Sequence, residues 1–217
     1  DLPGTMRFIA RSVRGELELT RGNVRTAALI QRVSLRYAGN WRSILGSGSQ
    51  WELYILSMCL VTDVELSPDD AVELDARAVR ARATSLLREI LSDPAPLQRD
   101  IPTLMAFAAA VGLSAVAAED VGSDRRAVGG ELVATALAVG TNHTCRLLSH
   151  DYLRSRTERL DARALAQAEE RIRSLDRGGL VAHAADLAGR LAGEVGRVPE
   201  ARLRRCAAGS ARPSGEP

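Results

Sequence analysis

The chain contains no lysine, and all 29 of its basic residues are arginine. P-loop NTPases, protein kinases, Schiff-base enzymes and Ser-x-x-Lys acyl transferases are therefore excluded, because each needs a lysine at its reacting centre. Aromatic residues make up only 3% of the sequence, whereas alanine occurs 34 times. A core of this composition is built from leucine, valine and alanine, which suits close packing between helices.

Cysteine is also scarce: Cys59, Cys145 and Cys206 are far apart and form no C-x-x-C pair. An odd, scattered set argues against a disulfide framework and fits a reducing compartment, so we expect a cytoplasmic protein. The apolar stretch near the start is interrupted by arginines and does not have the pattern of a signal peptide. The longest uncharged run, 101–118, holds a proline and seven alanines, which predicts a buried central helix rather than a membrane span.

The charges that are present are distributed unevenly. Residues 1–50 carry eight arginines against three acids, a net charge of +5, and residues 51–124 carry five against thirteen, a net charge of −8. Residues 125–217 return to +5, with sixteen arginines against eleven acids. A basic head before an acidic centre indicates either a polyanionic partner for the head or direct packing of the two segments.

Apolar residues recur at helical spacing, and no convincing alternating strand is found, so the sequence predicts an all-α bundle of eight to ten helices. We expect a basic helical head over 1–48, a helical bundle over 49–197 and an arginine-containing, largely disordered tail over 198–217. The clearest expected helix is capped by Ser67, ends at Asp93, and buries Val72, Ala76, Val79, Ala83, Leu86 and Ile90. The other helices of the bundle are expected at about 100–119, 124–140, 144–160, 161–176 and 180–195, with Asp161 as the cap of the fourth.

The arginines of the head follow a regular spacing. Arg21, Arg25, Arg32 and Arg36 are separated by steps of four, seven and four, which places them near one face of a continuous helix. Gly22-Asn23 allows a helix to begin, and a second short helix could end near Gly39-Asn40. Three short helices within 22–47, with small residues between them, would form a helix-turn-helix unit.

The stretch 22–53 resembles the DNA-binding head of the tetracycline-repressor (TetR) family. The resemblance rests on Gly22, Thr26 and Ile30 at steps of four, and on Gly39-Asn40-Trp41 through Leu45 to Ser47. It implies a ligand-responsive, dimeric transcriptional regulator whose head reads double-stranded DNA and whose bundle binds a small-molecule effector. A second register, with Gly22-Asn23-Val24, Ala27-Ala28 and Val33-Ser34, is similar to the Fis-type helix-turn-helix.

In such a regulator, Arg25 and Arg42 would contact phosphates, and Arg36, Tyr37 and Asn40 would face base edges. The alternative is an arginine-bearing amphipathic helix packed on the acidic centre. The protein would then be a protein–protein interaction module without catalytic activity, with the Gly/Ala-rich helices at 124–140 and 180–195 as its contact surface.

Two further clusters are candidates for chemistry. The run from Asp69 to Glu73 looks like the magnesium-diphosphate motif of helical terpenoid synthases. Directly after Ser67-Pro68, however, these acids are explained by helix capping and the helix dipole, and we expect neither a metal nor a cofactor.

The second cluster comprises His143, Cys145 and His150, which could form a helical enzyme's Cys-His site, although polar residues at a helix start are the simpler interpretation. His143, His150 and His183 could also line a ligand pocket in the bundle. Its apolar wall would be formed by Met58, Met105 and Phe107.

Overall fold

Every secondary-structure element in the described part of the chain is a helix, which confirms the all-α prediction. The computed structural model describes residues 4–45, 50–92, 101–118, 121–141 and 145–193, with side chains for 10–37 and from Trp51 onward in these ranges. The predicted tail at 198–217 lies outside them. The elements are α1 (Gly4–Thr20), α2 (Val24–Leu45), α3 (Gln50–Asp63), α4 (Pro68–Glu73), α5 (Ala76–Ser92), α6 (Ile101–Ala117), α7 (Ser123–Val139), the 3₁₀ turn η2 (Arg146–Leu148), α8 (His150–Ile172) and α9 (Arg177–Gly193).

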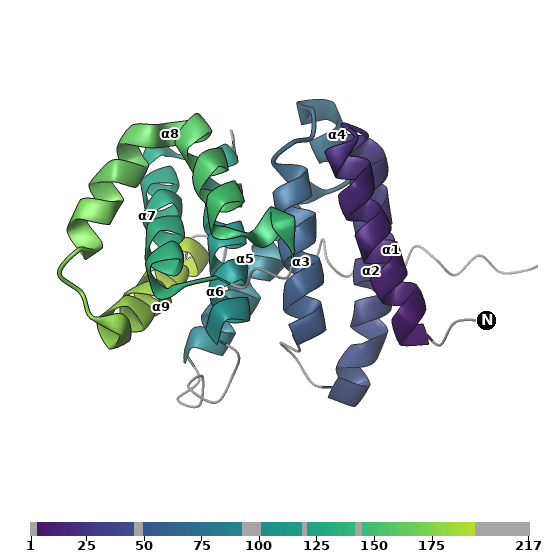
Figure 1. Cartoon of the computed structure of the whole chain (residues 1–217), viewed down its shortest axis with the longest axis horizontal. Helices are drawn as coiled ribbons and strands as arrows, with labels where there is room; N and C mark the ends of the chain where they lie inside the picture. The colour runs from purple at the N-terminus through teal and green to yellow at the C-terminus, as the bar shows by residue number, and fades with distance from the viewer. Residues whose placement is uncertain (1–3, 46–49, 93–100, 119–120, 142–144, 194–217) are drawn as a thin grey trace, which may run out of the picture.

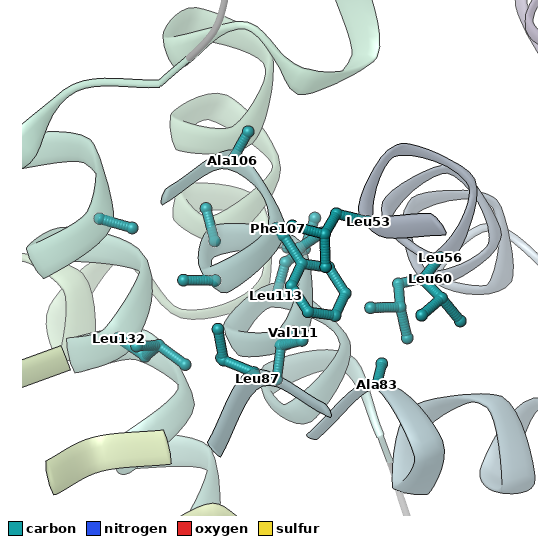
Figure 2. Close-up of a cluster of buried hydrophobic side chains, with 14 of the residues drawn as sticks. Leu53, Leu56, Leu60, Ala83, Leu87, Ala106, Phe107, Val111, Leu113 and Leu132 are labelled. Carbon is teal, nitrogen blue, oxygen red and sulfur yellow. The ribbon is translucent and has the colours of Figure 1, made fainter. Parts of the chain in front are cut away.

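Helix α6 lies at the centre of the core, with α3 on one side and α7 on the other (Figure 1). Figure 2 shows Phe107 of α6 on the side that faces Leu56 and Leu60 of α3, while Leu132 of α7 lies on the opposite side. All residues of α6 from Leu104 to Val116 are buried, as predicted for the uncharged run. Within the described ranges, no helix combines the length and hydrophobicity needed to span a bilayer.

Helix α7 packs against α6, α8 and α9 and is an internal element of the bundle. Its glycines, Gly129 and Gly130, are buried, and so are most of its apolar residues. The prediction that the Gly/Ala-rich stretch 124–140 is an external contact surface is therefore wrong. Small residues let α7 approach its neighbours in the same chain closely. The apolar face of α9, which includes Leu180 and Leu187, is likewise buried inside the bundle.

The helix predicted from Ser67 to Asp93 is two helices. Ser67 caps α4 as expected, because its hydroxyl accepts a hydrogen bond from Asp70 N at 3.3 Å. Asp75 then adopts φ +52°, which ends α4, and its carboxylate accepts from Ala78 N to begin α5. The predicted core residues Val79, Ala83, Leu86 and Ile90 are buried in α5, but Val72 is not part of the core and is 83% exposed.

The two helices predicted at 144–160 and 161–176 differ from the observed ones at their start and at their junction. Ser149 caps α8 after η2, and Asp161, with φ −160° and ψ 80°, kinks α8. The Asp161 carboxylate accepts a hydrogen bond from Ala164 N at 2.8 Å, which is the capping role that the sequence predicts for it. Arg154 before the kink forms an ion pair with Glu169 after it, so the two halves of α8 fold towards each other.

The largest correction concerns the basic head. Residues 24–45, expected to contain short helices separated by turns, form the single helix α2. The TetR resemblance places the turn between the helices at Ser34-Leu35-Arg36-Tyr37, which contains no glycine. The Ser34 hydroxyl donates a hydrogen bond to Ile30 O within the helix, and Leu35 is buried in the core. Helices α1 and α2 lie side by side as an antiparallel hairpin, with Gly22 at φ +82° in the turn (Figure 1). A DNA-binding helix-turn-helix needs a turn between helices that cross at a wide angle, and α2 provides none.

Candidate interaction surface

The α1–α2 hairpin forms one end of the bundle, and α2 joins it to the core. Ala27, Ala28 and Leu35 of α2 are buried, and α2 packs on α3. Between the two hairpin helices, Gln31 Nε2 donates to Ser12 O at 3.3 Å. The two helices approach closely at Gly15, where an added Cβ would require the Gln31 side-chain amide to shift.

The face of α2 that does not contact α3 carries an apolar row. Leu29, Val33 and Tyr37 follow one another at steps of four residues, so they lie along one side of the helix. Leu29 is 44% exposed, Tyr37 is 49% exposed and Val33 is half-buried. We call these three residues the α2 stripe.

Helix α1 adds two apolar side chains to the exposed surface of the hairpin. Val13 and Leu17, one helical turn apart, are 45% and 49% exposed. Arg11, also on α1, stacks on the ring of Tyr37, with its guanidinium carbon 4.8 Å from the ring centroid. This cation–π contact fixes the position of Tyr37 at one end of the α2 stripe.

Two exposed arginines flank the α2 stripe. Arg36 is exposed beside Tyr37 on α2, and Arg14 is exposed on α1. The register set by the contacts Arg11–Tyr37 and Ser12–Gln31 places Arg14 opposite the middle of the stripe. The next carboxylate along α1, Glu18, accepts hydrogen bonds from Asn23 at 2.7 Å and Arg21 at 3.2 Å. The bond from Asn23 and the charge of Arg21 hold the Glu18 pKa below its usual value.

Arg25, predicted to contact phosphate, is engaged by acids of α4. It forms ion pairs with Asp70 and Glu73, and its Nη2 lies 2.7 Å from the Glu73 carboxylate. Hydrogen bonds from Ser67 and Arg25 lower the pKa of Asp70, and Arg25 lowers that of Glu73. The acids from Asp69 to Glu73 thus lie within α4, after the Ser67 cap, and two of them bind an arginine. Among the described residues, no group of three or more His, Cys, Asp or Glu side chains could hold a metal ion.

Only some of the other residues predicted to contact DNA are found together on an exposed surface. Arg36 and Tyr37 are exposed on α2 about three turns beyond Arg25. The side chains of Asn40 and Arg42 lie outside the described residues, although the backbone of both belongs to α2.

The predicted ligand-pocket residues lie in different environments. Met58, Met105 and Phe107 are completely buried members of the main hydrophobic core. His150 is at the start of α8, 3.4 Å from the carboxylate of Asp151, with 41% of its side chain exposed. His143 lies outside the described residues. The structure therefore places the apolar residues in the packed interior and His150 at the surface.

Cys145 is buried against Met58, with 3.5 Å between the two sulfur atoms. Burial and the nearby Glu16 carboxylate raise the pKa of the Cys145 thiol to about 11. A nucleophilic cysteine needs the opposite shift, so this environment disfavours the predicted Cys-His chemistry.

Comparison of the chain with protein-family models, with curated proteins and with solved structures finds no match. The surface therefore has to be interpreted from its own residues. The α2 stripe was not predicted from the sequence, in which Val33 belongs to the second helix-turn-helix register. The steps of four from Leu29 to Tyr37 were a visible signal, but which side of α2 faces the core depends on α1 and α3.

Proposed function

We propose that this chain is a protein–protein interaction module and that the α1–α2 hairpin is the element that contacts the partner. The observation that carries this proposal is the α2 stripe, an apolar row exposed between arginines at one end of the bundle. Exposed apolar residues that are contiguous and bordered by polar groups mark interaction sites more often than isolated ones do.

The residue types on the hairpin support the same function. Tyrosine and arginine are enriched at the centres of protein interfaces, because each combines a large contact area with hydrogen-bonding groups. Tyr37 and Arg11 are already held against each other, which reduces the side-chain entropy lost when a partner binds. Val13 and Leu17 add exposed apolar surface on α1, on a different side of that helix from Ser12 and Gly15, which contact α2.

The TetR-like proposal has less support from the geometry, since α2 is continuous and Arg25 is paired with acids. A regulator of that kind would need a recognition helix held at an angle to its neighbour.

Site-specific photo-crosslinking in the cells that produce the protein tests the proposal. A photoreactive benzoylphenylalanine replaces Leu29 in one variant and Leu160 of α8 in a matched control, since the two leucines are 44% and 45% exposed. We expect a discrete, protease-sensitive adduct from position 29 that position 160 does not give. Identical adducts from both positions, or a nuclease-sensitive adduct from position 29, would overturn the proposal.

A further inference from the structure

We infer that the partner surface that fits the α2 stripe is an amphipathic helix of another protein with an apolar face and acidic flanks. This inference rests on the proposed function and specifies its partner. Its basis is the combination of an exposed apolar row, from Leu29 to Tyr37, with arginines on both sides of the row.

The dimensions of the α2 stripe suit a helix. Leu29 and Tyr37 are eight residues apart, which corresponds to about 12 Å along the helix axis. A partner helix covers this length with two turns, so apolar residues at positions i, i+4 and i+7 would meet Leu29, Val33 and Tyr37. Recognition of this kind uses the ordinary packing of helix ridges and grooves.

The charges select an acidic partner. Arg36 lies on one side of the α2 stripe, and Arg11 and Arg14 lie on the side of α1. A guanidinium group donates two parallel hydrogen bonds to a carboxylate, so glutamates on both flanks of the incoming helix would be matched. The Glu18 carboxylate on the same hairpin is occupied by Asn23 and Arg21 and is only 14% exposed.

A second copy of this chain does not fit the same surface. In a two-fold antiparallel arrangement of two α2 helices, each flank faces its own equivalent, so the flank that carries Arg36 lies against the same flank of the other copy. In a parallel arrangement, the Arg36 flank faces the flank with Arg11 and Arg14. Both arrangements place like charges together, which disfavours self-association through the stripe.

Nucleic acid is the other polyanion that arginines bind, but it fits the apolar part of the surface poorly. Phosphates would meet Arg14 and Arg36, whereas Leu29 and Val33 would find no apolar surface on a sugar–phosphate backbone. An acidic amphipathic helix satisfies both the charged and the apolar residues.

The test is a binding titration of the full chain against two fluorescent helical peptides. Both peptides carry the same leucines at i, i+4 and i+7, and their flanks are glutamate in one and arginine in the other. We expect the acidic peptide to bind and the basic one not to, with affinity that falls as salt is raised from 50 to 300 mM.

Two substitutions with matched controls locate the binding site. Arg36→Glu should lower the affinity for the acidic peptide at least tenfold. Arg163→Glu, an equal change of charge at an exposed position of α8, should leave that affinity unchanged. Leu29→Asp should abolish binding, and Leu160→Asp should leave it intact. Circular dichroism of each variant verifies that the helices remain folded.

The possible failures are distinguishable. Equal binding of both peptides, no binding of either up to 1 mM, or equal effects of Arg36→Glu and Arg163→Glu would overturn the acidic-helix inference. Preferential binding of duplex DNA, competed by salt and lost in Arg36→Glu, would overturn it as well. A specific protein adduct at position 29 whose contacting segment is basic would overturn the inference alone. The absence of any protein adduct there would overturn the proposed function too.

Discussion

Gly112 of α6 and Gly129 of α7 lie against each other's backbone. A Cβ on Gly112 would be 2.5 Å from the carbonyl oxygen of Gly129, and a Cβ on Gly129 would be 2.8 Å from that of Gly112. Backbone atoms cannot move aside as a flexible side chain can, so Gly112→Ala must push the two central helices apart. We expect it to lower the free energy of unfolding by about 1–3 kcal/mol, measured by urea denaturation.

Gly130 provides the matched control for this prediction. It is also buried in α7, but a Cβ there would meet only Ala164 Cβ at 3.8 Å and Val116 at 4.0 Å, which are ordinary contacts. Gly130→Ala should therefore raise stability by about 0.5–1 kcal/mol, because alanine favours the helix. If Gly112→Ala stabilises the protein as much as Gly130→Ala does, the close crossing of α6 and α7 does not exist.

The sequence predicted best where a local signal was sufficient. The Ser67 cap, the buried run of α6 and the cap at Asp161 are set by neighbouring residues, and all three are confirmed. The helix-turn-helix expectation differs from the structure at 34–37, where α2 continues without a turn and Leu35 packs into a core formed with distant helices.

For the candidate site, the sequence predicted the basic head and, as one alternative, its packing on the acidic centre, which the ion pairs of Arg25 and Arg32 confirm, but not which residues would meet. The sequence showed that the head is basic, but Arg25 finds its partners Asp70 and Glu73 more than forty residues away. This pairing decides which arginines are neutralised and which remain exposed. Helical periodicity in the sequence does not reveal pairs between distant residues. The exposure of Leu29 could not be derived from the sequence either, because it depends on which side of α2 packs against α3.

Arg32 and Asp63 form a largely buried ion pair between α2 and α3. Arg32 Nη2 donates to both carboxylate oxygens at 2.8 and 2.7 Å, and Nε donates to Leu74 O at 3.1 Å. Arg32→Ala would leave the Asp63 carboxylate buried without its cation, so we expect a loss of about 3–5 kcal/mol in chemical denaturation.

Two variants test whether this loss comes from the orphaned charge. Arg21→Ala, which removes an arginine that is 65% exposed and paired with Glu18, should cost at most about 1 kcal/mol. The double variant Arg32→Met/Asp63→Leu should recover much of the stability, because it removes both charges. If the double variant is as unstable as Arg32→Ala, the loss arises from packing instead.

The thiols of Cys59 and Cys145 should be unreactive in the native protein. Burial raises the Cys59 pKa to about 12 and the Cys145 pKa to about 11, so the thiolate that reacts with alkylating agents is scarce at pH 8. In a Cys206→Ser background, iodoacetamide labelling followed by mass spectrometry should modify neither thiol until denaturant is added. Rapid native labelling of Cys145 would contradict its burial against Met58.

The same two thiols should make the fold sensitive to alkali. Their ordinary pKa is 9.0, and in the folded state it is raised, so between pH 9 and about pH 11 the native protein holds protons that the unfolded chain has released. Stability is then fully present below pH 9 and falls as the pH rises through this window. The fall should be shallower for Cys59→Ala/Cys145→Ala when unfolding is measured from pH 8 to pH 11. An unchanged slope would assign the alkaline loss to other groups.

The kink of α8 depends on Asp161, since its carboxylate satisfies Ala164 N where the helical hydrogen bonds are interrupted. Asp161→Ala removes this acceptor and should cost about 1 kcal/mol, whereas Asp161→Asn, which keeps an oxygen at the same place, should cost much less. Asp186→Ala, at an exposed position within α9, should change stability by no more than about 0.5 kcal/mol. Equal losses for Asp161→Ala and Asp161→Asn in thermal unfolding would show that the negative charge, rather than the cap, supports the kink.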